Sequence, residues 1–110
     1  MWIFTPSGFV SAVKDSGEGK IVVRARDRAS LKSISSRFNS PIRPTPLADY
    51  PYRVLLGHDQ FVDWVSNQAG AIDYRNFKSE VAITRGTQFA RALSQVWSIM
   101  HEVEDEESRK

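Results

Sequence analysis

The chain of 110 residues contains no cysteine. It therefore has no disulfide framework, no thiolate zinc site and no cysteine nucleophile, and this composition favours a reducing compartment. Long apolar runs are also missing, since no stretch approaches the roughly 20 apolar residues that a membrane helix needs. The first residues lack the basic and apolar regions of a signal peptide. These absences predict a soluble, cytoplasmic protein with no membrane partner.

Groups that commonly carry catalysis are also scarce. The two histidines, His58 and His101, do not have the spacing of metal ligands or of a base and its orienting partner. The segment 17–19, Gly-Glu-Gly, joins two expected strands and does not open a helix, so it lacks the amide cluster of a phosphate loop. No pair of carboxylates is singled out by its neighbours. We therefore predict no catalytic, cofactor-binding or metal-binding residue and no enzymatic activity.

Size and composition predict one domain. A chain of this length could not support two independent cores, and 41% of its residues are hydrophobic, an ordinary fraction for a globular protein. We place this single domain at residues 1–103. The remaining segment, 104–110, is charged and has nothing apolar to bury, so we expect it to fray.

The first third of the sequence predicts an antiparallel meander of three strands. Residues 2–5 and 9–14 are rich in β formers and are separated by Pro-Ser-Gly. A second turn over residues 15–19 precedes the third strand. In that strand Ile21 and Val23 alternate with Arg24, which places the arginines on the face opposite the apolar side chains.

The middle of the chain predicts a helix, a loop and a further strand. Asp27 can cap a helix whose apolar stripe contains Leu31, Ile34 and Phe38 and which stops at 39–41. The three prolines of segment 41–46 predict a loop or an irregular sheet edge. A strand follows over residues 50–56. Its residues Tyr52, Val54 and Leu56 share one face, and Gly57 ends it.

The second half predicts helices. His58 or Asp59 should cap the first of them. Its apolar stripe consists of Phe61, Val65, Ala69 and Ile72. A short helical stretch with Phe77 and Val81 follows and is broken at 85–87. The last helix has the most regular pattern, formed by Phe89, Leu93, Val96, Met100 and Val103. Trp64 and Trp97 are expected in the core, with an anchoring role for a partner as the alternative.

These elements predict an α+β fold, with an antiparallel sheet of about four strands and helices packed mainly on one face. A ferredoxin-like plan is one option for this arrangement.

Charge is distributed unevenly along the chain. Residues 1–56 carry nine Lys or Arg against four Asp or Glu, a net charge of +5, whereas residues 57–110 carry a net charge of −3. The basic segment offers a nucleic-acid surface, for which Tyr50 and Tyr52 could supply stacking rings. A plain solvated face is the alternative. The basic candidates are Arg24, Arg26, Arg28, Lys32 and Arg53.

A second candidate patch lies at residues 73–78, Asp-Tyr-Arg-Asn-Phe-Lys. Its polar residues can bond the backbone of a turn between two helices, while the aromatic residues anchor that turn to the core. The functional alternative is a recognition patch. That patch would contain Tyr74, Arg75, Asn76 and Lys78.

Several elements of the sequence carry a family resemblance. They are Trp2-Ile3-Phe4-Thr5 with Gly8-Phe9, Val23-Arg24-Ala25-Arg26, Asp49-Tyr50-Pro51-Tyr52-Arg53, residues 72–78, and Val96-Trp97-Ser98. Together they resemble a family of small uncharacterised proteins of bacteria, plasmids and phages, over nearly the whole chain. That family has no assigned reaction, ligand or partner. The resemblance thus implies a compact domain in a mobile-element context and transfers no catalytic residue.

The leading functional hypothesis is a non-enzymatic accessory protein that binds a host or phage macromolecule, most simply another protein. An inhibitor of a host defence system is one example of this class. A nucleic-acid-binding protein that uses the basic face is the second hypothesis, and a small enzyme is the third. A homodimer through a free sheet edge or the aromatic helical half is a further expectation.

Overall fold

A computed structural model describes residues 1–17 and 19–109, without the side chain of Arg109. The chain divides into two compact units, Met1–Asp73 and Tyr74–Lys110, and we describe each by itself. The expectation of one domain over residues 1–103 stays a prediction. Glu18, within the second predicted turn, and Lys110, at the end of the predicted tail, lie outside the described residues.

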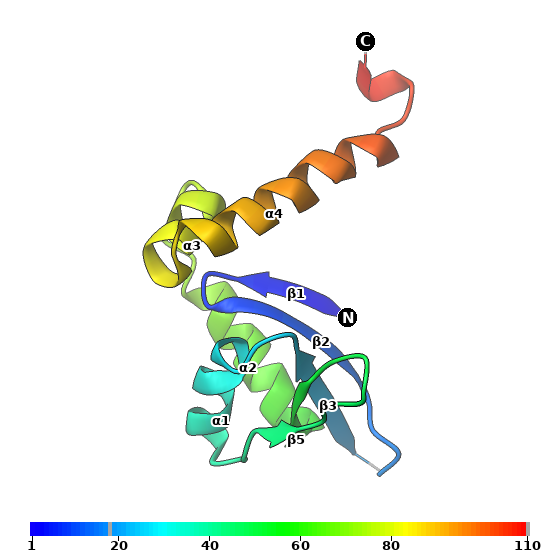
Figure 1. Cartoon of the computed structure of the whole chain (residues 1–110), viewed down its shortest axis with the longest axis vertical. Coiled ribbons are helices and arrows are strands. Elements are labelled where there is room, and N and C mark those ends of the chain that lie inside the picture. The colour runs from blue at the N-terminus through cyan, green and yellow to red at the C-terminus, as the bar shows by residue number, and fades with distance from the viewer. Residues whose placement is uncertain (18, 110) are drawn as a thin grey trace. The chain divides into compact units, whose positions relative to one another are not determined.

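The first unit is built on a sheet of five strands in the order β1-β2-β3-β5-β4, in which all neighbours are antiparallel (Figure 1). The strands are β1 (Trp2–Thr5), β2 (Gly8–Lys14), β3 (Lys20–Ala25), β4 (Arg43–Pro44) and β5 (Tyr52–Gly57). The predicted meander is confirmed as β1, β2 and β3. The α+β class is also confirmed, with five strands in place of about four. One helical segment lies between these strands, so their connectivity differs from the βαββαβ order of a ferredoxin-like sandwich.

The segment with three prolines forms the irregular sheet edge that its composition predicts. Strand β4 has two residues and pairs with β5, Arg43 opposite Arg53 and Pro44 opposite Tyr52. Proline cannot donate to a ladder, which limits this strand to the edge of the sheet.

Two helices belong to the first unit, α1 (Lys32–Phe38), preceded by a 3-10 turn (Ala29–Leu31), and α2 (His58–Gly70). The predicted role of Asp27 is confirmed, because its Oδ1 accepts from the backbone nitrogen of Ser30 at 3.1 Å. Asn39 ends α1 in the left-handed conformation, with φ at 50°.

The predicted cap of α2 is wrong. His58 and Asp59 already belong to the helix, and Gly57 is the N-cap residue. The backbone amide of Gly57 donates to Oε1 of Gln60 at 2.8 Å, so a side chain from inside the helix accepts from the amide at its N-terminal end.

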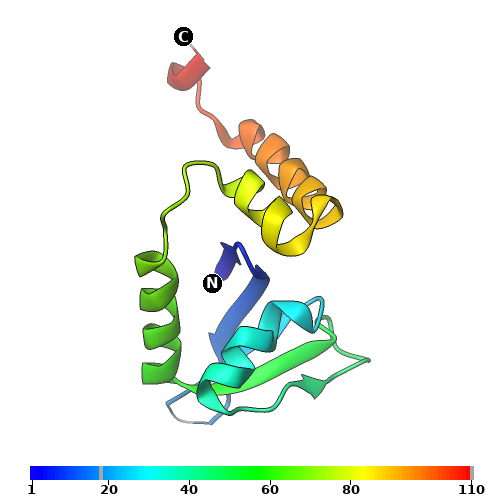
Figure 2. The ribbon, with the colours of Figure 1, turned by 90° about the vertical axis from the view of Figure 1, so that its left-hand side faces the viewer.

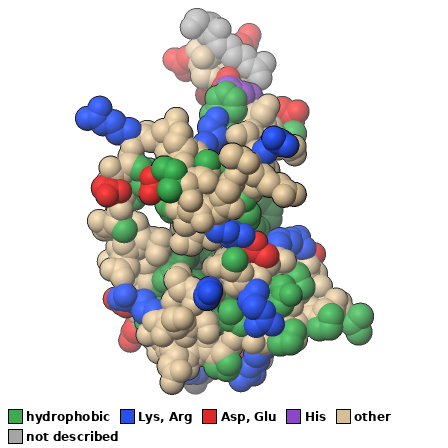
Figure 3. Space-filling model, turned by 60° about the vertical axis from the view of Figure 1, so that its left-hand side comes forward, with side chains coloured by type: hydrophobic (Ala, Val, Ile, Leu, Met, Phe, Trp, Pro, Cys, Tyr) green, Lys and Arg blue, Asp and Glu red, His purple; other side chains and the backbone are tan. Residues whose placement is uncertain are grey.

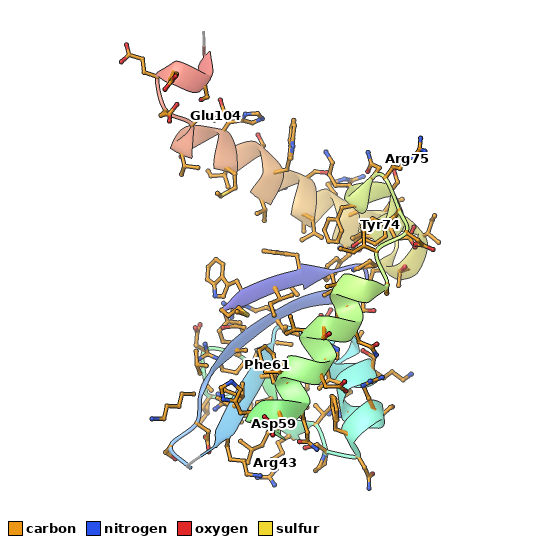
Figure 4. All side chains as sticks on the ribbon, turned by 180° about the vertical axis from the view of Figure 1, so that it is seen from behind. Arg43, Asp59, Phe61, Tyr74, Arg75 and Glu104 are labelled. Carbon is orange, nitrogen blue, oxygen red and sulfur yellow. The ribbon has the colours of Figure 1, made fainter. Side chains whose placement is uncertain are left out.

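Both helices pack on the same face of the sheet (Figure 2). Phe61 points from α2 toward the strands (Figure 4) and lies in one core cluster with Trp64. The sheet contributes to that cluster Val10, Ala12, Val23, Ala25, Val54 and Leu56. The burial of Trp64 confirms its predicted place in the core. Ala69 and Ile72 are exposed, so the predicted stripe of α2 is wrong beyond Val65.

The second unit is a helical hairpin. It contains α3 (Phe77–Arg85), α4 (Thr87–Ile99) and two 3-10 turns (Met100–Val103 and Glu107–Arg109). Gly86 alone joins the two α-helices. Val81 and Leu93 are buried, whereas Trp97 is 59% exposed, so its predicted place in the core is wrong. Within the described residues, no helix combines the length and the apolar character that crossing a membrane requires.

Candidate functional site

The face of the sheet opposite α1 and α2 is the candidate site. Residues directly opposite each other on antiparallel strands point to the same face, so the register defines its membership. One line of partners runs across all five strands: Trp2 pairs with Ser11, Ser11 with Arg24, Arg24 with Arg53, and Arg53 with Arg43. We call this line the cross-strand row. No helix of the first unit packs on this face, which we call the open face.

Three arginines follow one another along the cross-strand row. Arg24, Arg53 and Arg43 lie on neighbouring strands, and like charges directly opposite each other destabilise a sheet. In the part of the chain that the structure describes, no carboxylate forms an ion pair with any of the three. Arg24 does donate from Nη2 to Oγ of Ser11 at 2.8 Å. The row is therefore a concentration of positive charge that an external anion would stabilise.

Two donors of this row are buried without a partner. The Nε atoms of Arg24 and Arg53 are both inaccessible and make no hydrogen bond among the described residues. A buried donor left unsatisfied costs about 1–3 kcal/mol. This cost adds to the repulsion between the guanidinium groups.

The ring of Tyr50 contacts two of the guanidinium groups on or beside the open face. The guanidinium carbon of Arg24 lies 4.7 Å from the centre of the Tyr50 ring, and that of Arg26 lies 4.3 Å from it. Thr45 fixes this segment, because its Oγ1 donates to the carbonyl of Tyr50 at 2.7 Å. The segment rich in proline thus positions the ring against two guanidinium groups.

The structure does not support Tyr50 as a stacking ring for a nucleic acid, because the residue is only 4% exposed. Tyr52 packs against the core on the other face of the sheet. The exposed aromatic group of the open face is Trp2, which is 69% exposed. Its ring meets that of Phe9 edge-on at 5.6 Å, and Phe9 stacks on Phe4 at 4.6 Å.

Sequence reasoning missed this aromatic cluster of Trp2, Phe4 and Phe9, and it missed Arg43. The signal was available in the first hairpin. Once Phe4 is paired with Phe9, the alternation of β1 and β2 places all three rings on the face of Arg24. Arg43 had no comparable signal, because its strand has only two residues.

The residues predicted to bind a macromolecule are distributed over several places. Arg24, Arg26 and Arg53 lie together on or beside the open face. Arg28 instead lies 5.1 Å from the ring centre of Tyr52, which belongs to the other face. Lys32 is exposed at the start of α1.

The four candidates around residue 75 belong to the second unit. Asn76 caps α3, since its Oδ1 accepts from the backbone nitrogen of Ser79 at 2.9 Å, and this confirms the structural reading of that residue. The ring of Tyr74 lies 6.0 Å from that of Phe77. Lys78 places its Nζ 4.3 Å from the ring centre of Trp97. Arg75 is exposed.

The histidines occupy surface positions. His58 is exposed in the first turn of α2. His101 lies with its Nδ1 2.7 Å from Oε1 of Glu104 and with its ring edge-on to Trp97. Over residues 1–17 and 19–109, no three His, Asp or Glu side chains gather in a way that could hold a metal ion.

Comparison with known proteins gives no match, either to a protein-family model, to a curated protein or to a solved structure. The resemblance to small bacterial, plasmid and phage proteins therefore stays a prediction, and the candidate site rests on its own geometry. Chemically, the open face combines the guanidinium groups of three arginines with the exposed ring of Trp2 at the other end of the same row.

Proposed function

We propose that the protein binds single-stranded nucleic acid on the open face, with phosphates on the arginines of the cross-strand row and a base stacked on Trp2. The observation that carries this proposal is the row itself. Three arginines without carboxylate partners among the described residues are aligned with an exposed tryptophan on one sheet face, and neither helix of the first unit packs on that face. Figure 3 shows Lys and Arg side chains interspersed with hydrophobic ones on the visible side of the molecule.

The geometry favours a single strand over a duplex. Stacking on an aromatic ring requires a base whose face is free, and paired bases in a helix do not offer one. The four steps between neighbouring strands, each about 4.8 Å, give the row a length of about 19 Å. A few nucleotides can lie along that distance with their phosphates facing the guanidinium groups.

The sequence favoured a protein partner over a nucleic acid, and that hypothesis stays a prediction. An acidic protein could also neutralise the arginines. Tryptophan and arginine also anchor protein interfaces, so their presence alone does not separate the two classes of partner. Cations repeated at intervals of about 4.8 Å along one line additionally suit the repeating phosphates of a single strand, and a base stacked on the ring would contribute about 1–3 kcal/mol. The geometry therefore supports the nucleic-acid hypothesis better.

Titration of labelled single-stranded DNA and RNA by fluorescence anisotropy, over a series of salt concentrations, tests the proposal. We expect affinity to fall steeply with salt, because binding releases counterions from the phosphates. Arg24→Ala with Arg53→Ala should lower the slope of the logarithm of affinity against that of salt by about 1.4, at roughly 0.7 per lost contact. Trp2→Ala should weaken binding about 5- to 150-fold and leave the slope unchanged.

Two further variants sharpen the test. Arg24→Lys with Arg53→Lys keeps the charge and should keep the slope. Arg28→Ala with Lys32→Ala removes two cations of the same basic segment that lie away from the open face, so its effect should be small. Absence of binding to any oligonucleotide at low salt would falsify the proposal. An equal loss in both double-alanine variants would contradict the assignment to the cross-strand row.

A further inference from the structure

The C-terminal end of α4 carries an apolar surface that is not buried within the helical hairpin. Helix α3 has nine residues and α4 has 13, followed by the 3-10 turn that ends at Val103. Lys78, in the first turn of α3, already lies against Trp97. Because the two helices are antiparallel neighbours joined by one residue, the chain beyond Trp97 extends past the start of α3.

This extension continues the apolar stripe of the buried part of α4. The stripe repeats at intervals of four and three residues, which is the spacing of a helix-packing seam. Leu93 is buried on it, whereas the next members are exposed. With Ile99, which lies on the same side of the helix, they form a surface that we call the α4 patch, and its residues are Val96, Ile99, Met100 and Val103.

Charge is segregated along the same hairpin. Residues 74–99 carry four cations and one acid, whereas residues 100–107 carry five acids and no Lys or Arg. Glu104 lies beyond the C-terminal end of α4, away from Arg75, which precedes α3 (Figure 4). Acidic side chains also gather near the C-terminal end in Figure 3. The unit is therefore basic along the paired part of its two helices and acidic beyond the C-terminal end of α4, and the α4 patch adjoins the acidic end.

We infer that the α4 patch is the self-association surface of this protein, on which a second copy packs in antiparallel orientation. A two-fold axis near Ile99 would bring the patches of both copies together. Each acidic end would then lie beside Arg91 and Lys78 of the other copy. The same complementary contact forms twice, as a symmetric dimer requires. A second copy is the occupant because the chain itself carries both charges of this contact, Arg91 and the acids of residues 102–107. The antiparallel orientation follows because a parallel pair would place the acidic ends side by side.

Sedimentation equilibrium of the full chain over a range of concentrations tests this inference. We expect a reversible equilibrium between monomer and dimer. Met100→Glu should weaken dimerisation by at least about tenfold, because it buries a charge without a partner. The matched control is Ile83→Glu, which places the same charge at an exposed apolar position of α3 outside the patch. A chain that is monomeric at every concentration overturns the inference, as does equal weakening by the two variants.

The orientation is tested separately. Since the chain has no cysteine, Ile99→Cys introduces a unique thiol near the expected axis, and mild oxidation should link two copies through it. Arg91→Glu and Glu107→Arg should each weaken the dimer, whereas an equal mixture of the two should restore it as a heterodimer. Dimerisation without restoration in the mixture, or without cross-linking at position 99, contradicts the antiparallel arrangement.

Discussion

The side chain of Leu31 shows how strongly the first unit depends on single core residues. It is completely buried in the cluster between the helices and the sheet, whereas Leu47 is completely exposed in the segment after β4. We expect Leu31→Ala to lower the free energy of unfolding by about 2–5 kcal/mol, through lost burial and the cavity left behind. Leu47→Ala should change it by less than about 0.5 kcal/mol. Denaturant unfolding monitored by circular dichroism measures both, and similar losses would contradict this account of the core.

The burial of two tryptophans, Trp64 and Trp97, shows how far the sequence predicts the environment of a single residue. Both lie beside the apolar stripes of their helices, and the sequence predicts both in the core. Trp64 is 3% exposed, because α2 packs along the sheet over its middle turns. Trp97 is 59% exposed, because it lies at the level where α3 begins, and there Lys78 contacts its ring. Periodicity identifies the side of a helix that can be buried, but the length of the neighbouring helix decides how much of it is.

At the level of elements, the junction between α3 and α4 depends on a glycine. Gly86 has φ at 93° and ψ at 167°, a region of backbone conformation that is open essentially to glycine alone. A Cβ atom there would meet no neighbour, so the cost of Gly86→Ala comes from the backbone alone. We expect it to destabilise the protein by about 1–3 kcal/mol, measured by thermal unfolding.

Gly70→Ala is the matched control for that substitution. Gly70 is the last residue of α2, its φ is not positive, and a Cβ atom there would also meet nothing. Alanine should therefore stabilise the protein by about 0.4–1 kcal/mol, because it restricts the unfolded chain. Opposite signs for the two substitutions are expected. Stabilisation by Gly86→Ala would show that the positive φ of Gly86 is not required for the turn between α3 and α4.

Elements were predictable where local chemistry determines them. The alternation in β3, the cap by Asp27 and the break at Asn39 each depend on a few adjacent residues, and the structure has all three. The start of α2 was not predictable in the same way. The backbone amide of Gly57, at the N-terminal end of α2, donates to the side chain of Gln60 inside the helix. The predicted capping residues, His58 and Asp59, lie within the helix instead.

At the scale of the whole molecule, the open face shows what sequence alone cannot supply. The alternation of β3 correctly separated Arg24 from Val23, but its pairing with β5 spans a helix and an irregular edge strand. Only that pairing aligns Arg24 with Arg53 and Arg43. The row of like charges is thus a product of long-range register, and this row favours a nucleic acid over a protein as the partner.

The two proposed surfaces belong to different units, so they can be combined in one prediction. A dimer through the α4 patch carries two open faces on one particle. An oligonucleotide long enough to reach both should then bind more tightly than a short one, since the second contact becomes intramolecular. We expect Met100→Glu to weaken binding of the long oligonucleotide by about tenfold or more, and to leave the short one unaffected.

Arg24→Ala with Arg53→Ala should show the opposite pattern. It should weaken both oligonucleotides and leave the monomer–dimer equilibrium unchanged, because the open face and the α4 patch share no residue. Anisotropy titrations with both lengths, run beside sedimentation of the same samples, separate the two effects. If Met100→Glu weakens the short oligonucleotide as much as the long one, dimerisation and binding are not independent, and the assignment of one surface to each unit is wrong.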